Sequence, residues 1–426
     1  MRAHIKAVIL LVATLLVPAL ARADVLKIVV RDTIHPISDE FIGRALDQAA
    51  RDHDEAVLIQ LSTPGGLVDS TRDIIQKILA SPVPVIVYVA PSGARAASAG
   101  FFILESADVA AMAPGTNTGA AHPVVFGGEK MDQVMKEKME NDAAAFMRSF
   151  VSKRGRNLEV AESAVRQSKS FTDQEALKEH LIDVIAPDEA DLLKQLDGRS
   201  VTRFNGSTTV LHLANQRVQV LDMSLKQKIL DFIMDPNVAF ILFAIGMLAL
   251  YVEFNHPGAI LPGVVGFIFV LLAIFAFNIL PTRYAALILI VAAFVMFVLD
   301  AKFATHGVLT VGGIALMILG ALLLVDAPIP EMRVRLVTAL VVSVPIGLIT
   351  VFLVGLVIKA RRSKVVTGQQ GLIGEIGVAQ SALQPEGKVF VHGELWDAVS
   401  SANVAPGQRV QVKRIDGLRL EVDPVK

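Results

Sequence analysis

Pro64-Gly65-Gly66 and Ala97-Ser98-Ala99-Gly100 are the two stretches of this 426-residue sequence that decide its fold. Each follows an apolar run and precedes an amphipathic helical pattern. Glycine in such a turn allows backbone conformations closed to other residues and exposes an N–H group. The small neighbours of Ser98 let a carbonyl approach its hydroxyl, and a helix start favours developing negative charge. The pair predicts acyl transfer by a serine nucleophile, although Pro-Gly-Gly alone is typical of ordinary turns.

The region around these motifs alternates between strand and helix patterns. Strands separated by helices of this length predict right-handed βαβ crossovers and a mostly parallel sheet. A longer helical pattern follows at 131–153, and 197–222 predicts an accessory strand or linker. We therefore assign 24–222 to one α/β domain. Its predicted strands are 25–30, 56–61, 83–89 and 109–112, and its first helices are 38–50, 67–79 and 97–105.

The composition indicates a membrane protein. Hydrophobic residues make up 53% of the chain and concentrate in 1–20 and 237–359. A net charge of −1 provides no electrostatic footprint for nucleic acid. The absence of cysteine excludes a thiol nucleophile, a disulfide framework and a thiolate zinc site. The predicted chemistry needs no metal and no cofactor.

The N-terminus predicts a signal peptide over 1–23. Arg2 and Lys6 precede an apolar stretch at 7–20, and Ala21-Arg22-Ala23 is a small-x-small cleavage pattern. The alternative is an uncleaved membrane anchor. Either version sends the following domain across the membrane.

Residues 236–359 predict a multi-pass transmembrane domain of about five helices. The first and third spans are marginal, so counts of four and six stay open. The basic residues Lys359, Arg361, Arg362 and Lys364 indicate a cytoplasmic flank after the last span. An odd number of spans then places the α/β domain on the extracytoplasmic face of a bacterial-type inner membrane. The predicted spans are 238–254, 260–280, 285–299, 308–325 and 336–358.

Residues 365–426 are polar and contain about five short alternating strands punctuated by glycine. Turns are predicted at Pro385-Glu386-Gly387 and Pro406-Gly407. This pattern predicts a small closed barrel of the OB type on the cytoplasmic side.

The serine needs an oxyanion hole and a base. The N–H groups of Gly66 and Ala99 are the candidate oxyanion donors. Lys138 is one candidate base, because it points along the apolar stripe of the 131–151 helix and burial lowers the pKa of a lysine. The alternative is a lysine whose head reaches water. His122, in the loop after the fourth strand, is the rival base.

Residues 24–190 resemble the Clp-protease/crotonase superfamily. The whole layout resembles the NfeD-like membrane proteases associated with stomatins. One departure is His180, at a helix end where relatives usually have glycine and where a positive φ is costly for histidine. The segments that carry the resemblance are 61–66, 91–100, 112–116, 155–157, 175–177, 371–375 and 393–396.

The resemblance implies a Ser98–Lys138 dyad with Gly66 and Ala99 as oxyanion donors. It also implies cleavage of hydrophobic polypeptide segments, a stomatin-like partner and self-association into a homo-oligomer. Two other functions compete with a membrane-anchored serine endopeptidase. One is a non-proteolytic scaffold for a stomatin- or flotillin-type membrane assembly. The other is a crotonase-type acyl-CoA enzyme, which the extracytoplasmic location disfavours.

Overall fold

The computed structural model of the chain describes residues 24–124, 132–214, 216–255, 258, 260–303, 305, 307–327, 330–362 and 369–425. The predicted signal peptide lies outside these residues. The chain divides into two compact units. One comprises Met1–Met296 with Val311–Ile346, and the other Phe297–Thr310 with Gly347–Lys426.

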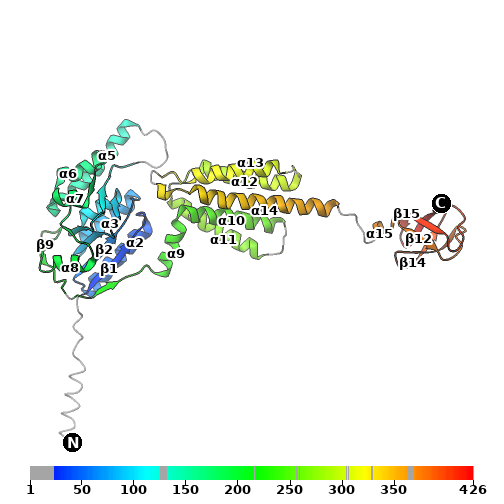
Figure 1. Cartoon of the computed structure of the whole chain (residues 1–426), viewed down its shortest axis with the longest axis horizontal. Coiled ribbons are helices and arrows are strands. Elements are labelled where there is room, and N and C mark those ends of the chain that lie inside the picture. Colours follow the sequence, from blue (N-terminus) through cyan, green and yellow to red (C-terminus); the bar gives the residue numbers. More distant parts are fainter. Residues whose placement is uncertain are drawn as a thin grey trace, which may run out of the picture. The chain divides into compact units, whose positions relative to one another are not determined.

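A six-stranded parallel sheet lies at the centre of the N-terminal domain (Figure 1). Its order is β11-β1-β2-β3-β5-β8, and each neighbouring pair is parallel. The inner strands are mostly apolar, with Lys27 in β1 and Gln60 in β2 as exceptions, because helices cover both faces of such a sheet. The predicted parallel sheet and accessory strand are confirmed. The strands are β1 (Val25–Val30), β2 (Ala56–Leu61), β3 (Val85–Val89), β5 (Val109–Met112), β8 (Val184–Ile185) and β11 (Val218–Val220).

Helices pack on both faces of this sheet. One core lies under α2 to α6, and a second lies under α8 and the hairpin of β9 (Ser200–Thr202) and β10 (Thr208–Val210). His180 follows α7 with a φ of 58°, the conformation expected to be costly for histidine. The helices are α2 (Pro36–Asp52), α3 (Val68–Ala80), α4 (Ala99–Ser106), α5 (Gln133–Val151), α6 (Leu158–Arg166), α7 (Asp173–Lys178) and α8 (Glu189–Leu196), with a 3-10 turn at Ser152–Arg154.

A second, three-stranded sheet was not predicted. It consists of β4 (Arg95–Ala97), β6 (Asn117–Gly119) and β7 (Ser170–Thr172), in the order β4-β6-β7. Consequently, the predicted helix at 97–105 begins two residues later, at Ala99, because Ala97 pairs with Gly119 in this sheet.

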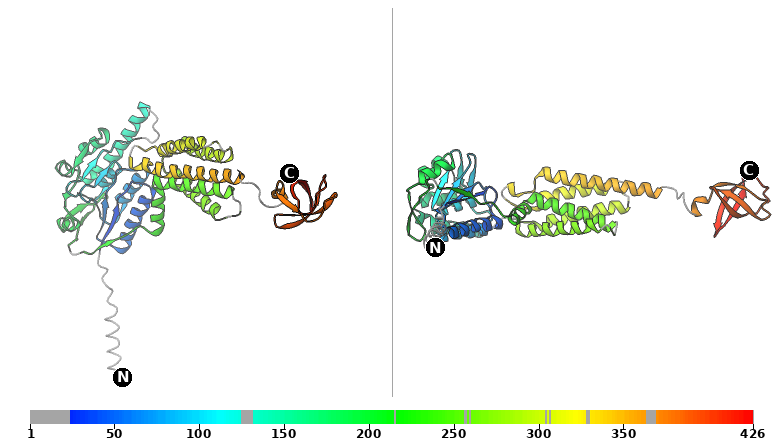
Figure 2. Two further views of the ribbon diagram at one scale, coloured as in Figure 1. Left: turned by 45° about the vertical axis from the view of Figure 1, so that its right-hand side comes forward. Right: turned by 90° about the horizontal axis from the view of Figure 1, so that it is seen from below.

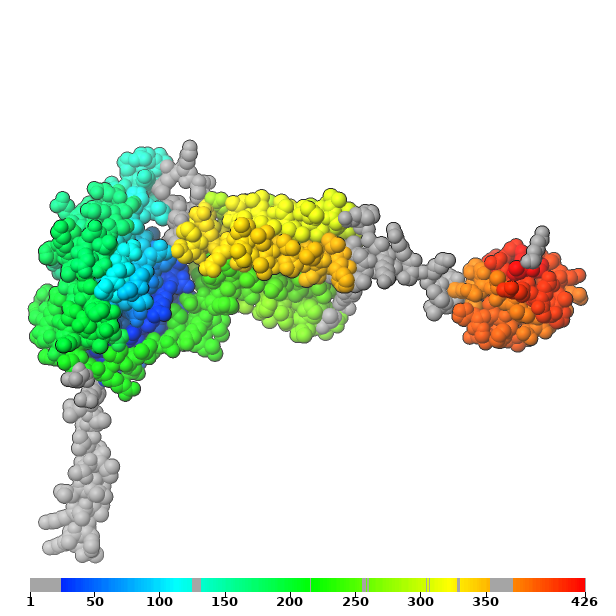
Figure 3. Space-filling model, viewed as in Figure 1, coloured from blue at the N-terminus to red at the C-terminus, as the bar shows by residue number. Residues whose placement is uncertain are grey.

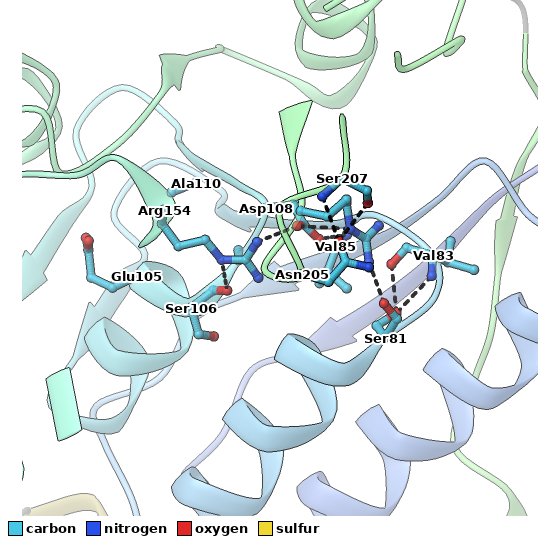
Figure 4. Close-up of polar contacts among 12 residues, drawn as sticks. Ser81, Val83, Val85, Glu105, Ser106, Asp108, Ala110, Arg154, Asn205 and Ser207 are labelled. Atoms are coloured by element: carbon cyan, nitrogen blue, oxygen red, sulfur yellow. Dashed lines mark hydrogen bonds and ion pairs between the residues drawn. The ribbon is translucent and has the colours of Figure 1, made fainter. Parts of the chain in front are cut away.

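A buried charge cluster lies beyond the C-terminal end of α4 (Figure 4). The Arg154 guanidinium pairs with Asp108 at 2.5 Å and donates to the Ser106 carbonyl at 2.9 Å. Glu105 is fully buried, and neither of its carboxylate oxygens has a hydrogen-bond partner among the described residues. Burial therefore raises the pKa of Glu105 to about 8, against the attraction of Arg156.

This carboxyl makes stability depend on pH in a defined direction. The folded chain holds the Glu105 proton up to a pKa of about 8, whereas the unfolded chain releases it near 4.5. The stabilising contribution is thus complete below pH 4.5 and is lost as the pH rises through 8. The loss amounts to about 5 kcal/mol at most, at about 1.36 kcal/mol per pKa unit.

We predict that Glu105→Gln raises the unfolding temperature at pH 9 and changes it little at pH 5, because the amide stays neutral. Calorimetry in detergent measures this, since the single tryptophan, Trp396, lies in the C-terminal barrel. The exposed Glu159→Gln is the matched control. An unchanged pH profile in Glu105→Gln would contradict a neutral buried carboxyl.

The described part of the membrane domain contains five apolar helices. Among the described residues, four are long and apolar enough to cross a bilayer, and Val308–Leu324 is shorter. The first and third helices were expected to be marginal in length, but they contain spans of 19 and 20 residues. The helix of marginal length is instead the fourth. The helices are α10 (Pro236–Asn255), α11 (Leu261–Ile279), α12 (Tyr284–Phe303), α13 (Val308–Leu324) and α14 (Leu336–Arg362).

Two glycines bring α10 and α11 together. A Cβ on Gly246 would lie 2.9 Å from the Gly266 carbonyl oxygen, and a Cβ on Gly266 would lie 2.8 Å from that of Gly246. Small residues allow such backbone contact between membrane helices, where apolar side chains gain nothing by leaving lipid.

The C-terminal domain is a closed five-stranded barrel, coloured orange to red in Figure 2. Its order is β12-β13-β14-β16-β15, and β14 runs parallel to β16. The predicted closed barrel is confirmed, but Glu386 and Gly387 begin β13 rather than form a turn. A short helix, α15 (Gln369–Leu372), precedes the barrel strands, which are β12 (Ile376–Ala379), β13 (Glu386–Val391), β14 (Glu394–Val399), β15 (Arg409–Asp416) and β16 (Arg419–Pro424).

Candidate active site

The Pro-Gly-Gly turn joins β2 to α3. Gly65 has a φ of 135°, which favours glycine. Gly66 has a different constraint, because a Cβ there would lie 2.2 Å from the Ile34 carbonyl oxygen. The turn is held close to the end of β1 by the Ile34 N–H, which donates to the Gly65 carbonyl at 2.8 Å.

Ser98 lies between β4 and α4 in a strained conformation. Its φ is 53° and its ψ is −111°, values that cost a residue with a side chain roughly 1–3 kcal/mol. Its N–H donates to the Gly119 carbonyl at 2.9 Å, which fixes the strained turn. A strained strand-to-helix turn of this kind presents a serine hydroxyl to substrate.

Direct contacts join the two motifs. The Thr63 N–H donates to the Arg95 carbonyl at 2.7 Å, and the Ala97 N–H donates to the Thr63 carbonyl at 3.1 Å. A Cβ on Gly100 would lie 2.5 Å from Thr63 Cγ2, so this glycine lets α4 approach the turn. The sequence separates the motifs by one βα unit, and the backbone brings them together.

Two backbone donors are unpaired beside Ser98. The N–H groups of Gly66 and Ala99 make no hydrogen bond to any residue that the structure describes. Ala99 is the first residue of α4, where N–H groups have no partner within the helix and the dipole favours negative charge. Both groups are available to an oxyanion.

A pocket of about 100 Å³ contains Ser98, Gly66 and Ala99 in its lining. Its other lining residues come mainly from α3, α4 and α5, and most are apolar. They are Val68, Thr71, Arg72, Phe102, Ala121, Pro123, Met139, Asp142, Ala143 and Phe146. Such a lining suits an apolar side chain of a substrate.

Arg72 and Asp142 connect α3 to α5 at this pocket. They form an ion pair, and the Arg72 guanidinium carbon lies 4.5 Å from the centre of the Phe146 ring. Phe146 also stacks on Phe102 of α4 at 6.2 Å between ring centres. Arg72 and Asp142 were not predicted as site residues, because nothing in their local pattern distinguishes them from solvated charges.

Lys138 lies at the edge of the pocket. It is next to Met139 and one helical turn before Asp142, both of which line the pocket. Its side chain is exposed and makes no hydrogen bond or ion pair within the described ranges.

The expectation that an apolar surface desolvates Lys138 is wrong for this structure. Val134 and Met135 are 55% and 51% exposed, and only Ala144, Met147 and the last turn of α5 are buried. The first turns of α5 project beyond the core (Figure 1). Met131, the first residue of the predicted stripe, lies outside the described residues.

His122 lies beside the pocket but not in its lining. Its Nδ1 donates to the Val165 carbonyl at 2.9 Å, since a carbonyl only accepts. The neighbouring Ala121 and Pro123 line the pocket instead.

The strand that carries Ser98 also contacts the membrane domain. The Arg95 guanidinium pairs with Glu331 at 2.5 Å, in the 3-10 turn Pro330–Met332 before α14. Figure 3 shows this yellow segment directly against the blue and cyan of the N-terminal domain.

Three family comparisons cover most of the chain. Residues 24–218 match the N-terminal domain of NfeD1b, 237–357 match the NfeD integral membrane domain, and 369–424 match the NfeD-like C-terminal, partner-binding domain.

Two relatives are similar over nearly their whole length. Membrane-bound protease PH1510 of Pyrococcus horikoshii is 36% identical over 417 residues, which cover 95% of this chain and 94% of the relative. Membrane protein NfeD1b of Bacillus subtilis is 28% identical over 399 residues, which cover 90% and 88%.

Solved structures of the 1510-N stomatin-specific protease also match the N-terminal half. A lysine-to-alanine mutant in complex with a substrate peptide is 34% identical, with a TM-score of 0.47, and covers 50% of this chain and 99% of that one. A serine-to-alanine mutant covers 48% and 100%, with a TM-score of 0.45. By its identity to PH1510 over nearly its full length, the chain belongs to the NfeD-like family of membrane-bound proteases.

Proposed function

We propose that this protein is a membrane-anchored serine endopeptidase with Ser98 as its nucleophile and Lys138 as its base. The observation that carries the proposal is the pocket that holds a strained Ser98 beside two unpaired N–H groups, of Gly66 and Ala99. Preorganised amides of this kind stabilise a tetrahedral oxyanion by roughly 3–4 kcal/mol per donor.

The reaction proceeds in two acyl-transfer steps. Ser98 Oγ attacks the peptide carbonyl while the neutral Lys138 Nζ takes the hydroxyl proton, and the oxyanion accepts from the Gly66 and Ala99 N–H groups. The tetrahedral intermediate then collapses and the C–N bond of the peptide breaks, while Lys138 gives the proton to the leaving amine. Water then attacks the acyl carbon of the Ser98 ester while Lys138 takes a proton from it. The bond from the acyl carbon to Ser98 Oγ breaks, Lys138 returns the proton to Oγ, and the carboxylic acid product leaves.

The substrate completes this site. A lysine acts as a base near neutral pH only when water is removed from it, and Lys138 is exposed here. An apolar segment that fills the pocket beside Met139 shields Lys138 from water. Catalytic hydrogen bonds often form only in the substrate complex.

The substrate that we propose is a hydrophobic segment of a stomatin-like membrane protein. The apolar lining supports the hydrophobic part, and the 1510-N relative, described as stomatin-specific, supports the partner. A homo-oligomer belongs to the same proposal, since Val134 and Met135 leave α5 with an exposed apolar surface.

A second candidate is a non-proteolytic scaffold for a stomatin- or flotillin-type assembly. The match of 369–424 to a partner-binding domain favours it, as does the Bacillus relative, which is named only as a membrane protein. Full cellular function of Ser98→Ala would favour the scaffold.

Ser98→Ala is expected to lower kcat by roughly 10⁴-fold or more, because the nucleophile is lost. Lys138→Met removes the base and should abolish labelling of Ser98 by a fluorophosphonate, while His122→Ala retains labelling. Peptide hydrolysis and probe labelling measure both effects. Loss of activity in His122→Ala with retention in Lys138→Met would make histidine the base, and unchanged hydrolysis by Ser98→Ala would refute the serine mechanism.

Gly66→Ala should lower kcat by about 10²–10³-fold, the usual effect of losing an oxyanion donor. The added Cβ meets the Ile34 carbonyl oxygen at 2.2 Å, so the turn must shift away from Ser98. Gly43→Ala is the control, because its Cβ meets only the flexible Lys77 side chain at 3.3 Å or beyond. Equal activity of the two variants would separate Gly66 from catalysis.

The orientation that we propose places the protease domain outside and the barrel in the cytoplasm. It rests on the basic residues Lys359, Arg361 and Arg362 after the last span. Because the chain has no cysteine, Lys178→Cys and Glu394→Cys create single labelling sites. A membrane-impermeant maleimide on intact cells should label the first and not the second, and the reverse pattern would invert the topology.

A further inference from the structure

The helix α9 (Leu225–Met234) connects the catalytic domain to the first membrane helix. Ser224 begins it with a capping box to Gln227, and Asp235 ends it with an extended conformation (φ −65°, ψ 125°). The next residue, Pro236, already starts α10, which leaves in a new direction (Figure 1). No helix was predicted over these ten residues.

One face of α9 holds the catalytic domain. Gln227 is 1% exposed and donates to Glu40 of α2 at 3.3 Å. Asp231 Oδ1 lies 3.1 Å from Nε2 of the buried His35, the residue that caps α2. The C-terminal end of α9 is also covered on the side of the membrane domain, since the buried Met234 lines a pocket with Ile279 and Leu280. The contacts of Gln227 and Asp231 hold α9 against the domain that carries the candidate active site.

The opposite face of α9 is apolar and uncovered. Leu225, Ile229 and Phe232 are 75%, 50% and 66% exposed. At about 100° per residue, these three positions fall within a stripe of about 60°. The apolar stripe of an amphipathic helix usually packs on a protein core. In α9 this stripe is instead exposed.

Two lysines border this stripe. Lys226 lies about 60° beyond Ile229, and Lys228 lies about 40° beyond Phe232 on the other edge. Both are exposed. Lys228 Nζ lies 3.8 Å from Asp222 Oδ2, which makes a loose ion pair at the surface. Lysines in these positions extend their heads to lipid headgroups while an apolar stripe enters the acyl region.

We propose that α9 is an interfacial helix whose Leu225–Ile229–Phe232 stripe is embedded in the bilayer surface. Its continuity with α10 selects lipid as the occupant, since a single residue separates α9 from a 19-residue span that starts at Pro236. The stripe faces away from α2, so a catalytic domain held on one side of α9 has the bilayer on the other.

This arrangement fixes the height of the active site above the membrane. α9 holds α2 through Gln227 and Asp231, and α2 packs beside α3, which begins just after Gly66. The pocket of Ser98 therefore stays close to the surface from which a membrane-embedded segment emerges.

The test measures the depth of α9 in the bilayer without any use of catalysis. The full chain carrying Ile229→Cys, or Leu225→Cys, is spin-labelled in vesicles of phosphatidylcholine and phosphatidylglycerol. The control is Val210→Cys, an apolar position of the same domain that is 44% exposed on β10. Collision with oxygen reports the acyl region, and collision with a nickel chelate reports water.

We expect a severalfold higher oxygen-to-nickel ratio at Ile229 and Leu225 than at Val210. Nickel accessibility equal to that of Val210 would place the stripe in water and overturn the proposal. Protection from both reagents, with spin–spin broadening at full labelling, would identify a second copy of the chain as the occupant and would also overturn it. Neither result bears on whether Ser98 is a nucleophile.

Discussion

The close approach of the Thr63 backbone to β4 is the contact on which the rest of the site depends. Two hydrogen bonds, from the Thr63 N–H to Arg95 and from the Ala97 N–H to Thr63, join the Pro-Gly-Gly turn to the strand before Ser98. Gly100 lets α4 approach the same turn, because a Cβ there would lie 2.5 Å from Thr63 Cγ2. Without this contact, the Gly66 and Ala99 amides would not share a pocket with the serine.

Glu105 and Lys138, two titratable groups on the helices around this site, lie in opposite environments. Glu105, on the helix that follows Ser98, is fully buried, and its pKa is raised to about 8. Lys138, the proposed base, is exposed to water on a projecting turn of α5. Burial supplies the free energy that shifts a pKa. The proposal that Lys138 is the base therefore depends on a substrate that covers it.

The membrane domain is more than an anchor for the catalytic domain. Its α10 and α11 are joined by reciprocal contact of Gly246 and Gly266, and the turn before α14 reaches Arg95 in β4, the strand before Ser98. The half-exposed Arg95–Glu331 pair contributes little stability, as is typical of surface ion pairs. Its importance is geometric, because it places a membrane-helix terminus beside the strand that carries Ser98.

The sequence by itself determined the elements with a local signature. Apolar runs defined the parallel strands, hydropathy defined the membrane helices, and small residues defined the turn that contains Ser98. The tertiary structure alone decided β4, the Arg72–Asp142 pair, the exposure of Lys138 and the exposed apolar face of α9. The physical reason is that periodicity reports a residue's neighbours along the chain. A three-residue strand and the burial of one side chain depend instead on elements that are distant in sequence.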